Sequence, residues 1–340
     1  MLGHVTCGAT ILAGTTSLCP MPAAPRDPHL GRRELVVGGF AAALTGVLGL
    51  GGCSRFTDPV VHGTRSVPPD AQAAPRPSFL TGAAGAADLR SRLQGWPTAG
   101  QRAWADQVRS MLDAHVQLLS AKEPLAGLPS PEVWATLDPS ASPTAGGSIT
   151  EAGFTTAATA LADTHQDTAL SAKDPSEAML WASLSVATRL NAKPGPAPAP
   201  TDLPRTVEFG TEVEARNVVL GYLHSLAQWL ELDLGDANKV EEALLNARLR
   251  EVRAAIRAEQ KVIRSLGGTP VAPLPGYSWP GPGEEERTRF LIERQVMEAW
   301  GPVVATSPQP RRRQALNQML SWGRGALAGG VGTSYFPGWV

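Results

Sequence analysis

Two carboxylates interrupt the apolar faces of helices that the sequence predicts in its C-terminal part. Glu259 stands between Ile256 and Ile263 at helical spacing, and Glu293 lies on the inward stripe of the next predicted helix. A charged group at such a position is costly to bury unless an opposite charge or a metal ion compensates it. These two positions are therefore the first candidates for chemistry.

Two interpretations of this pair are open. With Glu214 at the start of an earlier helix and His224 further along it, the carboxylates could form an oxygen-rich site for iron or another divalent metal. Alternatively, arginines neutralise them, which is the commoner role of such groups. The available arginines are Arg216, Arg253, Arg257 and Arg294. We predict ion pairs, no cofactor and no catalytic residue, with the metal site as the alternative.

Two histidines raise a similar question. His115 and His165 fall on the inward stripes of two other predicted helices. Facing imidazoles could bind a metal or respond to pH, but a lone histidine on an apolar face is more often a core residue. We predict the core role.

The segments that must position these groups all repeat at helical spacing. Residues 207–340 contain four amphipathic helices with little strand signal, which predicts an antiparallel four-helix bundle. Residues 81–193 form a further helical region, so the predicted fold class is all-α. Two helix starts are marked by capping residues, Ser148 with Glu151 and Asp174 with Glu177.

Proline-rich stretches divide the chain. Residues 54–80, rich in Pro and Ala, are predicted to be a disordered tether, and residues 194–206 a linker between the two helical regions.

Cys53 indicates where the chain works. It follows one apolar run, Leu35 to Leu50, which is too short to span a bilayer and lies behind Arg32 and Arg33. The run and the cysteine resemble the bacterial lipoprotein signal, in which the thiol receives a diacylglycerol group. The arginine pair resembles a twin-arginine export signal. Residues 1–53 are thus predicted to be the signal peptide.

The start of translation stays open between Met1 and Met21, because residues 1–20 do not resemble an export signal. Lipidation predicts a membrane-anchored, extracytoplasmic protein of the cell envelope, on the outer face of the cytoplasmic membrane.

Composition excludes several classes of protein. All three cysteines lie at or before Cys53, so the mature chain could form no disulfide, zinc ribbon or iron–sulfur cluster. Its 30 basic and 31 acidic residues are nearly balanced, which argues against a nucleic-acid partner.

Residues 207–340 resemble a ferritin-like domain of unknown function found in actinobacterial envelope lipoproteins with twin-arginine signals. The resemblance rests on four stretches: Asn217 to His224, Arg253 to Tyr277 with its Pro-rich crossing, Phe290 to Trp300, and Tyr335 to Gly338. It implies a ferritin-like up-and-down four-helix bundle, and fold alone implies no activity.

Ferritin-like di-iron proteins need Glu-x-x-His on the inner helix faces. The residues three before the six histidines are Met1, Arg26, Pro59, Leu112, Ala162 and Gly221. None is a carboxylate, so a conventional di-iron centre is not expected.

Two surface features have open interpretations. A row of basic residues flanks one predicted helix and could contact anionic lipid headgroups, although a solvated helix face is the commoner role. The row consists of Arg250, Arg253, Arg257, Lys261 and Arg264. The aromatic tail, with Tyr335, Phe336 and Trp339, is predicted to seal the open end of the bundle, with a partner anchor as the alternative.

Together these observations predict a non-enzymatic binding or interaction module, tethered to the membrane and acting on an unknown envelope protein or ligand. The alternative is a metal-binding ferritin-like protein, for metal storage or as an oxidoreductase. A small-molecule pocket between the two helical regions is a third possibility.

Overall fold

The computed structural model describes residues 61–64, 76–121, 124–125, 150–205, 207–277 and 287–339. All of them belong to one compact unit, Arg55–Val340. The predicted lipidation site Cys53 and the export residues Arg32 and Arg33 lie outside the described residues.

The described part of the chain is all-α, as predicted. A single turn of 3-10 helix, Ala99–Gln101, precedes α3, and two short strands, β1 (Val61–Thr64) and β2 (Val207–Phe209), pair antiparallel. The α-helices are α2 (Pro77–Ser91), α3 (Arg102–Ser120), α4 (Glu151–Ser171), α5 (Pro175–Leu190), α6 (Glu212–Asp236), α7 (Lys239–Ser265), α8 (Thr288–Thr306) and α9 (Gln309–Ala328). None of these helices is apolar over enough of its length to cross a bilayer.

The first residues of the helices explain where they begin. Asp174 caps α5 by accepting a hydrogen bond from the backbone N–H of Glu177 at 2.9 Å, which confirms that predicted start. In α4 the cap is Thr150, whose hydroxyl oxygen accepts from the N–H of Gly153. Ser148, the predicted cap, lies outside the described residues.

Residues 54–80, predicted to be a disordered tether, contain regular structure at two places. Val61–Thr64 pairs with β2, and α2 begins at Pro77. Proline suits the first turn of a helix, because the N–H that it lacks would have no helical partner there. The prediction is therefore wrong for these two segments.

The last four helices do not simply alternate in direction. Arg289 in the first turn of α8 binds Asp233 near the end of α6, whereas Ser307, just after α8, binds Glu212 at the start of α6. Thus α8 runs antiparallel to α6. Because α7 folds back along α6 after a short turn, α7 and α8 are parallel.

The connection from α7 to α8 must therefore cross from one end of the helices to the other. The predicted up-and-down order is wrong at this connection. Residues 266–287 could span about 70 Å if extended, well beyond the length of α8, about 28 Å. The chain is thus long enough for the crossover.

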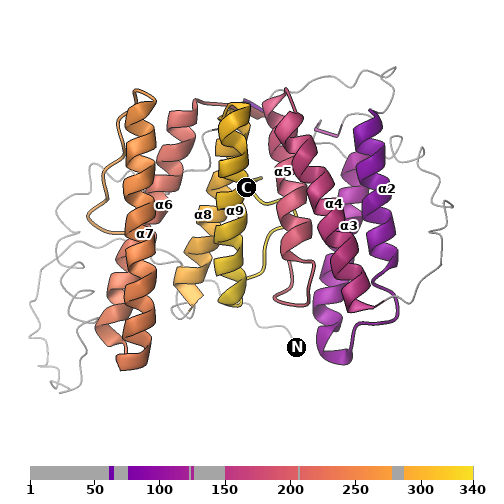
Figure 1. Ribbon diagram of the computed structural model, residues 1–340, viewed down its shortest axis with the longest axis horizontal. Helices are drawn as coiled ribbons and strands as arrows, with labels where there is room; N and C mark the ends of the chain where they lie inside the picture. Colours follow the sequence, from indigo (N-terminus) through magenta and orange to yellow (C-terminus); the bar gives the residue numbers. More distant parts are fainter. Residues whose placement is uncertain are drawn as a thin grey trace, which may run out of the picture. The chain divides into compact units, whose positions relative to one another are not determined.

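Helices from both sides of the Pro-rich linker pack against one another. The α8–α9 hairpin contacts α6 on one side and α5 on the other, and α4 pairs with α5 and α2 with α3 (Figure 1). Apolar residues from all eight helices belong to one core cluster.

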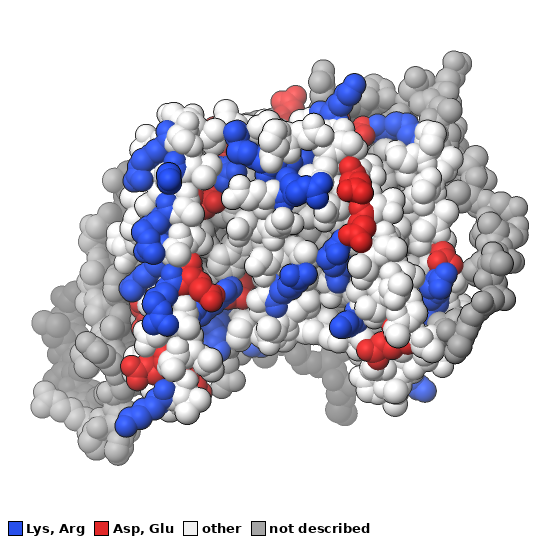
Figure 2. All heavy atoms as spheres, viewed as in Figure 1, with Lys and Arg blue, Asp and Glu red and all other residues white. Residues whose placement is uncertain are grey.

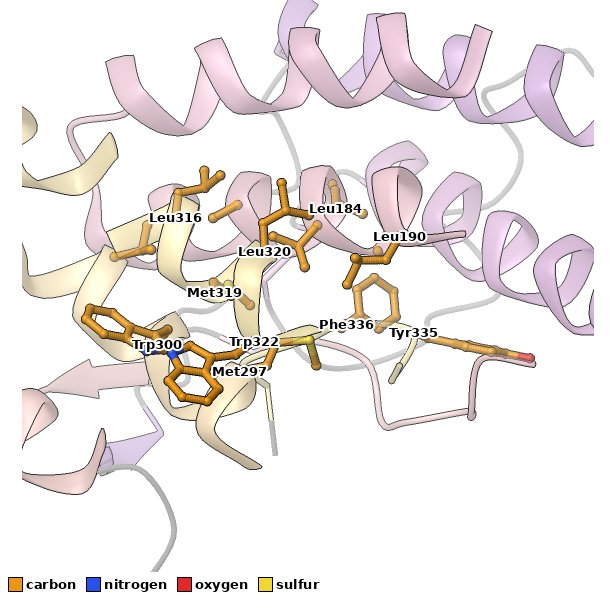
Figure 3. Packing of buried hydrophobic residues seen from close by; sticks show 14 of the residues in the cluster. Leu184, Leu190, Met297, Trp300, Leu316, Met319, Leu320, Trp322, Tyr335 and Phe336 are labelled. Carbon is orange, nitrogen blue, oxygen red and sulfur yellow. The ribbon is translucent and has the colours of Figure 1, made fainter. Parts of the chain in front are cut away.

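The C-terminal tail, residues 331–339, completes this core. Phe336 is fully buried and lies 5.1 Å from the ring of His115 in α3. Tyr335 donates from its hydroxyl to Gln107. Figure 3 shows both tail aromatics in one cluster with the leucines of α5 and the large apolar residues of α8 and α9. The tail is thus buried between the two helical regions, rather than sealing the open end of the C-terminal bundle.

Candidate functional site

Glu259, the first candidate carboxylate, is paired with an arginine. The guanidinium of Arg216 in the first turns of α6 donates to Glu259 at 2.7 Å, and both side chains are buried. The same guanidinium lies over the ring of Trp300 at 5.7 Å. Burial raises the pKa of Glu259, and the charge of Arg216 opposes that rise. This arginine is one of those that the sequence offered.

Glu212 extends the ion pair into a network. Arg216, which donates to Glu259, also donates to Glu212 at 2.9 Å. Glu212 accepts two further hydrogen bonds from Arg311 in α9 and one from the hydroxyl of Ser307. Burial alone would raise the pKa of Glu212, but the hydrogen bonds from Arg311 and Arg216 outweigh it and lower this pKa. The network ties α6, α7 and α9 together at one end of the unit.

Glu293 forms a separate ion pair. Arg248 of α7 donates to it at 2.8 Å and also binds Glu251, while its guanidinium stacks 4.7 Å from the ring centre of Trp322 in α9. Burial raises the pKa of Glu293, and the charge of Arg248 opposes the rise. Arg248 was not among the arginines considered from the sequence.

The two remaining candidate metal ligands, Glu214 and His224, lie in other surroundings. Glu214 belongs to the capping box of α6, where it accepts from the N–H of Thr211 at 2.6 Å. His224 is half-buried further along α6, beside the backbone of Val271, and burial lowers its pKa. A role in the helix cap explains the position of Glu214.

The structure does not bring these four residues together. Glu293 binds Arg248 of α7, and Arg248 is eleven positions from Glu259 on that helix. This separation is about 16 Å along the axis of α7. Within the described ranges no three His, Cys, Asp or Glu residues gather as they would around a metal. The donor set does not fit the di-iron centre of a ferritin-like protein, because arginines occupy the positions beside both inward carboxylates.

Glu298 is a buried carboxylate that the sequence analysis missed. It accepts a hydrogen bond from the hydroxyl of Ser334 at 2.6 Å and another from the backbone N–H of Gly338, both in the C-terminal tail. Burial raises its pKa to about 7, against the effect of those two hydrogen bonds. It is therefore the described carboxyl group best placed to exchange a proton near neutral pH.

The tail crosses α8 close to this carboxylate. Pro302 lacks an N–H, so the backbone carbonyl of Glu298 loses its usual helical donor in this turn. Gly301 lies so close to Gly338 that a Cβ on Gly301 would come within 2.7 Å of the tail backbone. Only glycine at position 301 lets the tail pass at this distance.

His115 and His165 are both buried in the core, as predicted. Nε2 of His115 donates to the backbone carbonyl of Tyr335 at 2.9 Å, and the ring of His165 packs 5.4 Å from Trp181. Burial lowers the pKa of His115 to about 4. Burial and the nearby His115 lower the pKa of His165 to about 3. Both rings are neutral at physiological pH.

Comparison of the chain with protein-family models, curated proteins and solved structures found no match. The ferritin-like resemblance therefore stays a prediction. What the described residues offer chemically is a set of buried charges that satisfy one another, together with one carboxyl group that titrates near neutral pH.

Proposed function

We propose that the chain is an envelope lipoprotein, anchored through Cys53 on the outer face of the cytoplasmic membrane, whose helical body acts as a non-enzymatic binding module. The observation that carries the proposal is the position of Cys53, directly after a short apolar run and ahead of a folded unit whose described residues begin at Val61.

The buried charges support binding over catalysis. Glu259, Glu293 and Glu298 each accept hydrogen bonds from other groups of this chain. A carboxylate whose oxygens accept from its own chain joins packed elements and is not directed at a substrate. We assign these groups to structure.

We further propose a ferritin-like fold for α6–α9. Its support is the long connection between the parallel helices α7 and α8, since ferritin-like bundles have one crossover of this kind. The metal-binding alternative lacks comparable support, because arginines occupy the positions next to Glu259 and Glu293. Bound iron, manganese and zinc in protein purified without chelators, lost from a Glu259→Ala variant, would reinstate it.

Cell fractionation tests the anchor. The Cys53→Ala variant should leave the membrane fraction, and its signal should remain uncleaved, because the thiol is both the lipid acceptor and the cleavage landmark. The matched control is Ser54→Ala, which should stay with the membrane. Equal membrane retention of both variants would refute lipid anchoring through Cys53.

The export route is tested separately. Replacing Arg32 and Arg33 by lysine keeps the positive charge but removes the arginine pair, so a twin-arginine signal should stop exporting the protein. Normal export of this variant would assign the protein to the general secretory pathway and leave the anchor proposal intact.

A further inference from the structure

The basic row on α7 forms a continuous stripe in the structure. Its members recur every three or four positions, so they share one flank of the helix over about 21 Å, and all are exposed. Figure 2 shows Lys and Arg side chains following α7 along the face in view. The stripe consists of Arg250, Arg253, Arg257, Lys261 and Arg264.

The acidic residues in this part of α7 point elsewhere. Glu259 is buried against Arg216, and Glu251 binds Arg248. Arg253 pairs with Glu231 of α6 across the surface. For the last three members, Arg257, Lys261 and Arg264, the described part of the chain provides no ion-pair partner. Among the described residues, the C-terminal half of the stripe therefore carries positive charge without an ion-pair partner.

Strand β1, the described element nearest to Cys53 in the sequence, lies at the same end. Strand β1 pairs with β2, which directly precedes α6, and the first turns of α6 bind the C-terminal part of α7 through Arg216 and Glu259. Cys53 is eight residues before Val61, a reach of at most about 28 Å. A lipid on Cys53 would thus hold this end of α7 close to the bilayer.

We propose that Arg257, Lys261 and Arg264 bind anionic lipid headgroups of the membrane to which the chain is tethered. The inference rests on the proposed anchor and adds a second, electrostatic contact. Positive side chains near a negatively charged leaflet are attracted within a Debye length of its surface, and two weak membrane signals together give stable attachment. The stripe would also fix which face of the helical body is turned to the membrane.

Vesicle binding by a chain without the lipid separates this contact from the anchor. The protein used is Ser54–Val340, which contains the whole compact unit. We expect it to bind phosphatidylglycerol-containing vesicles at low salt, to release them as salt rises, and to bind phosphatidylcholine vesicles at least tenfold more weakly.

The variant Arg257→Glu, Lys261→Glu, Arg264→Glu should bind the anionic vesicles at least tenfold more weakly. The variant with glutamine at the same three positions should lose part of the binding. It removes the positive charges without adding negative ones, so it controls for local misfolding caused by the charge reversal. The matched control reverses three exposed charges in the α2–α5 region, Arg102, Lys173 and Lys193, and should bind within about twofold of the parent.

Equal losses in the stripe variant and in the control variant would overturn the proposal, as would equal binding of the parent to neutral and anionic vesicles. No lipid is attached to the protein in this assay. If Cys53→Ala stays in the membrane fraction of cells, the anchor is rejected, but the vesicle result still decides whether the stripe binds anionic lipid.

Discussion

The two regions of the helical unit bury polar side chains in opposite ways. In α2–α5, His115 and His165 are buried as neutral rings against aromatic neighbours. In α6–α9, the buried arginine Arg216 and the partly buried Arg248 remain charged and bind buried carboxylates. The two histidines are thus buried without charge, whereas Glu259 and Glu293 are buried with an arginine that compensates their charge.

This difference has consequences for stability. A neutral buried histidine lowers stability further once acid protonates it, while a buried ion pair is costly when only one partner is lost. The N-terminal region should therefore be sensitive to pH and the C-terminal region to single substitutions.

The largest effect is expected where the two regions meet. Phe336→Ala should lower the free energy of unfolding by about 3–5 kcal/mol, because it leaves a cavity in the core shared by both regions. Urea unfolding followed by tryptophan fluorescence measures it. Val240→Ala, at a side chain that is 73% exposed, is the control and should change stability by less than about 0.5 kcal/mol. Similar values for the two variants would contradict the packing of the tail.

Breaking one ion pair should come next. Arg216→Met should cost about 3 kcal/mol, because it leaves Glu259 buried without its cation. The double variant Arg216→Met, Glu259→Leu should recover much of this loss, since neither charge then remains. Arg253→Met, which breaks an exposed pair with Glu231, should cost less than about 1 kcal/mol. A double variant less stable than Arg216→Met would argue against the pair.

The third prediction concerns acid. Unfolding exposes His165 and raises its pKa from about 3 back to the ordinary 6.5, so the unfolded state binds more protons below pH 6.5. Stability should fall as pH decreases from about 6.5 towards 4, by up to about 1.4 kcal/mol per pH unit for each buried histidine. In His165→Leu this slope should be roughly halved, with His115 supplying the remainder. Urea midpoints at pH 7, 6 and 5 measure it, and an unchanged slope would exclude His165 as the cause.

The smallest effect has the opposite sign. The pKa of Glu298 is raised from 4.5 to about 7 in the folded state, so its contribution to stability is lost as pH rises between those values. Glu298→Gln keeps an acceptor oxygen for the N–H of Gly338 and places its NH2 group beside the hydroxyl of Ser334, which can accept, but it cannot ionise. This variant should be more stable than the parent at pH 8 by about 1–2 kcal/mol, and about equal to it at pH 5. Thermal melts at the two pH values compare them, and Glu242→Gln at an exposed carboxylate is the control.

How far the sequence could predict these groups depended on local periodicity. Glu259 and Glu293 were found because each interrupts an apolar stripe, and Asp174 because a cap acts within its own helix turn. Glu298 was missed because α8 is buried almost all round near its C-terminal end, so no stripe marks its inner face. Its partners, Ser334 and Gly338, lie in the tail, beyond any local pattern.

Chain direction was also beyond local patterns. Each of the last four helices was recognised from its own residues, but the crossover depends on contacts far apart in the chain, such as Arg289 with Asp233. A proline-rich stretch indicates that a helix has ended. It does not indicate at which end of the bundle the next helix begins. The tail likewise has aromatic residues that predict burial, while its location depends on α3 and α5.

The burial of residues 331–339 makes the order of synthesis matter. Phe336 follows all eight described helices in the chain, and it fills the space between helices made much earlier. The emerging polypeptide must therefore stay partly open, with apolar surface uncovered, until residues 331–339 have been synthesised. The core between the two regions can close only after this tail has left the ribosome.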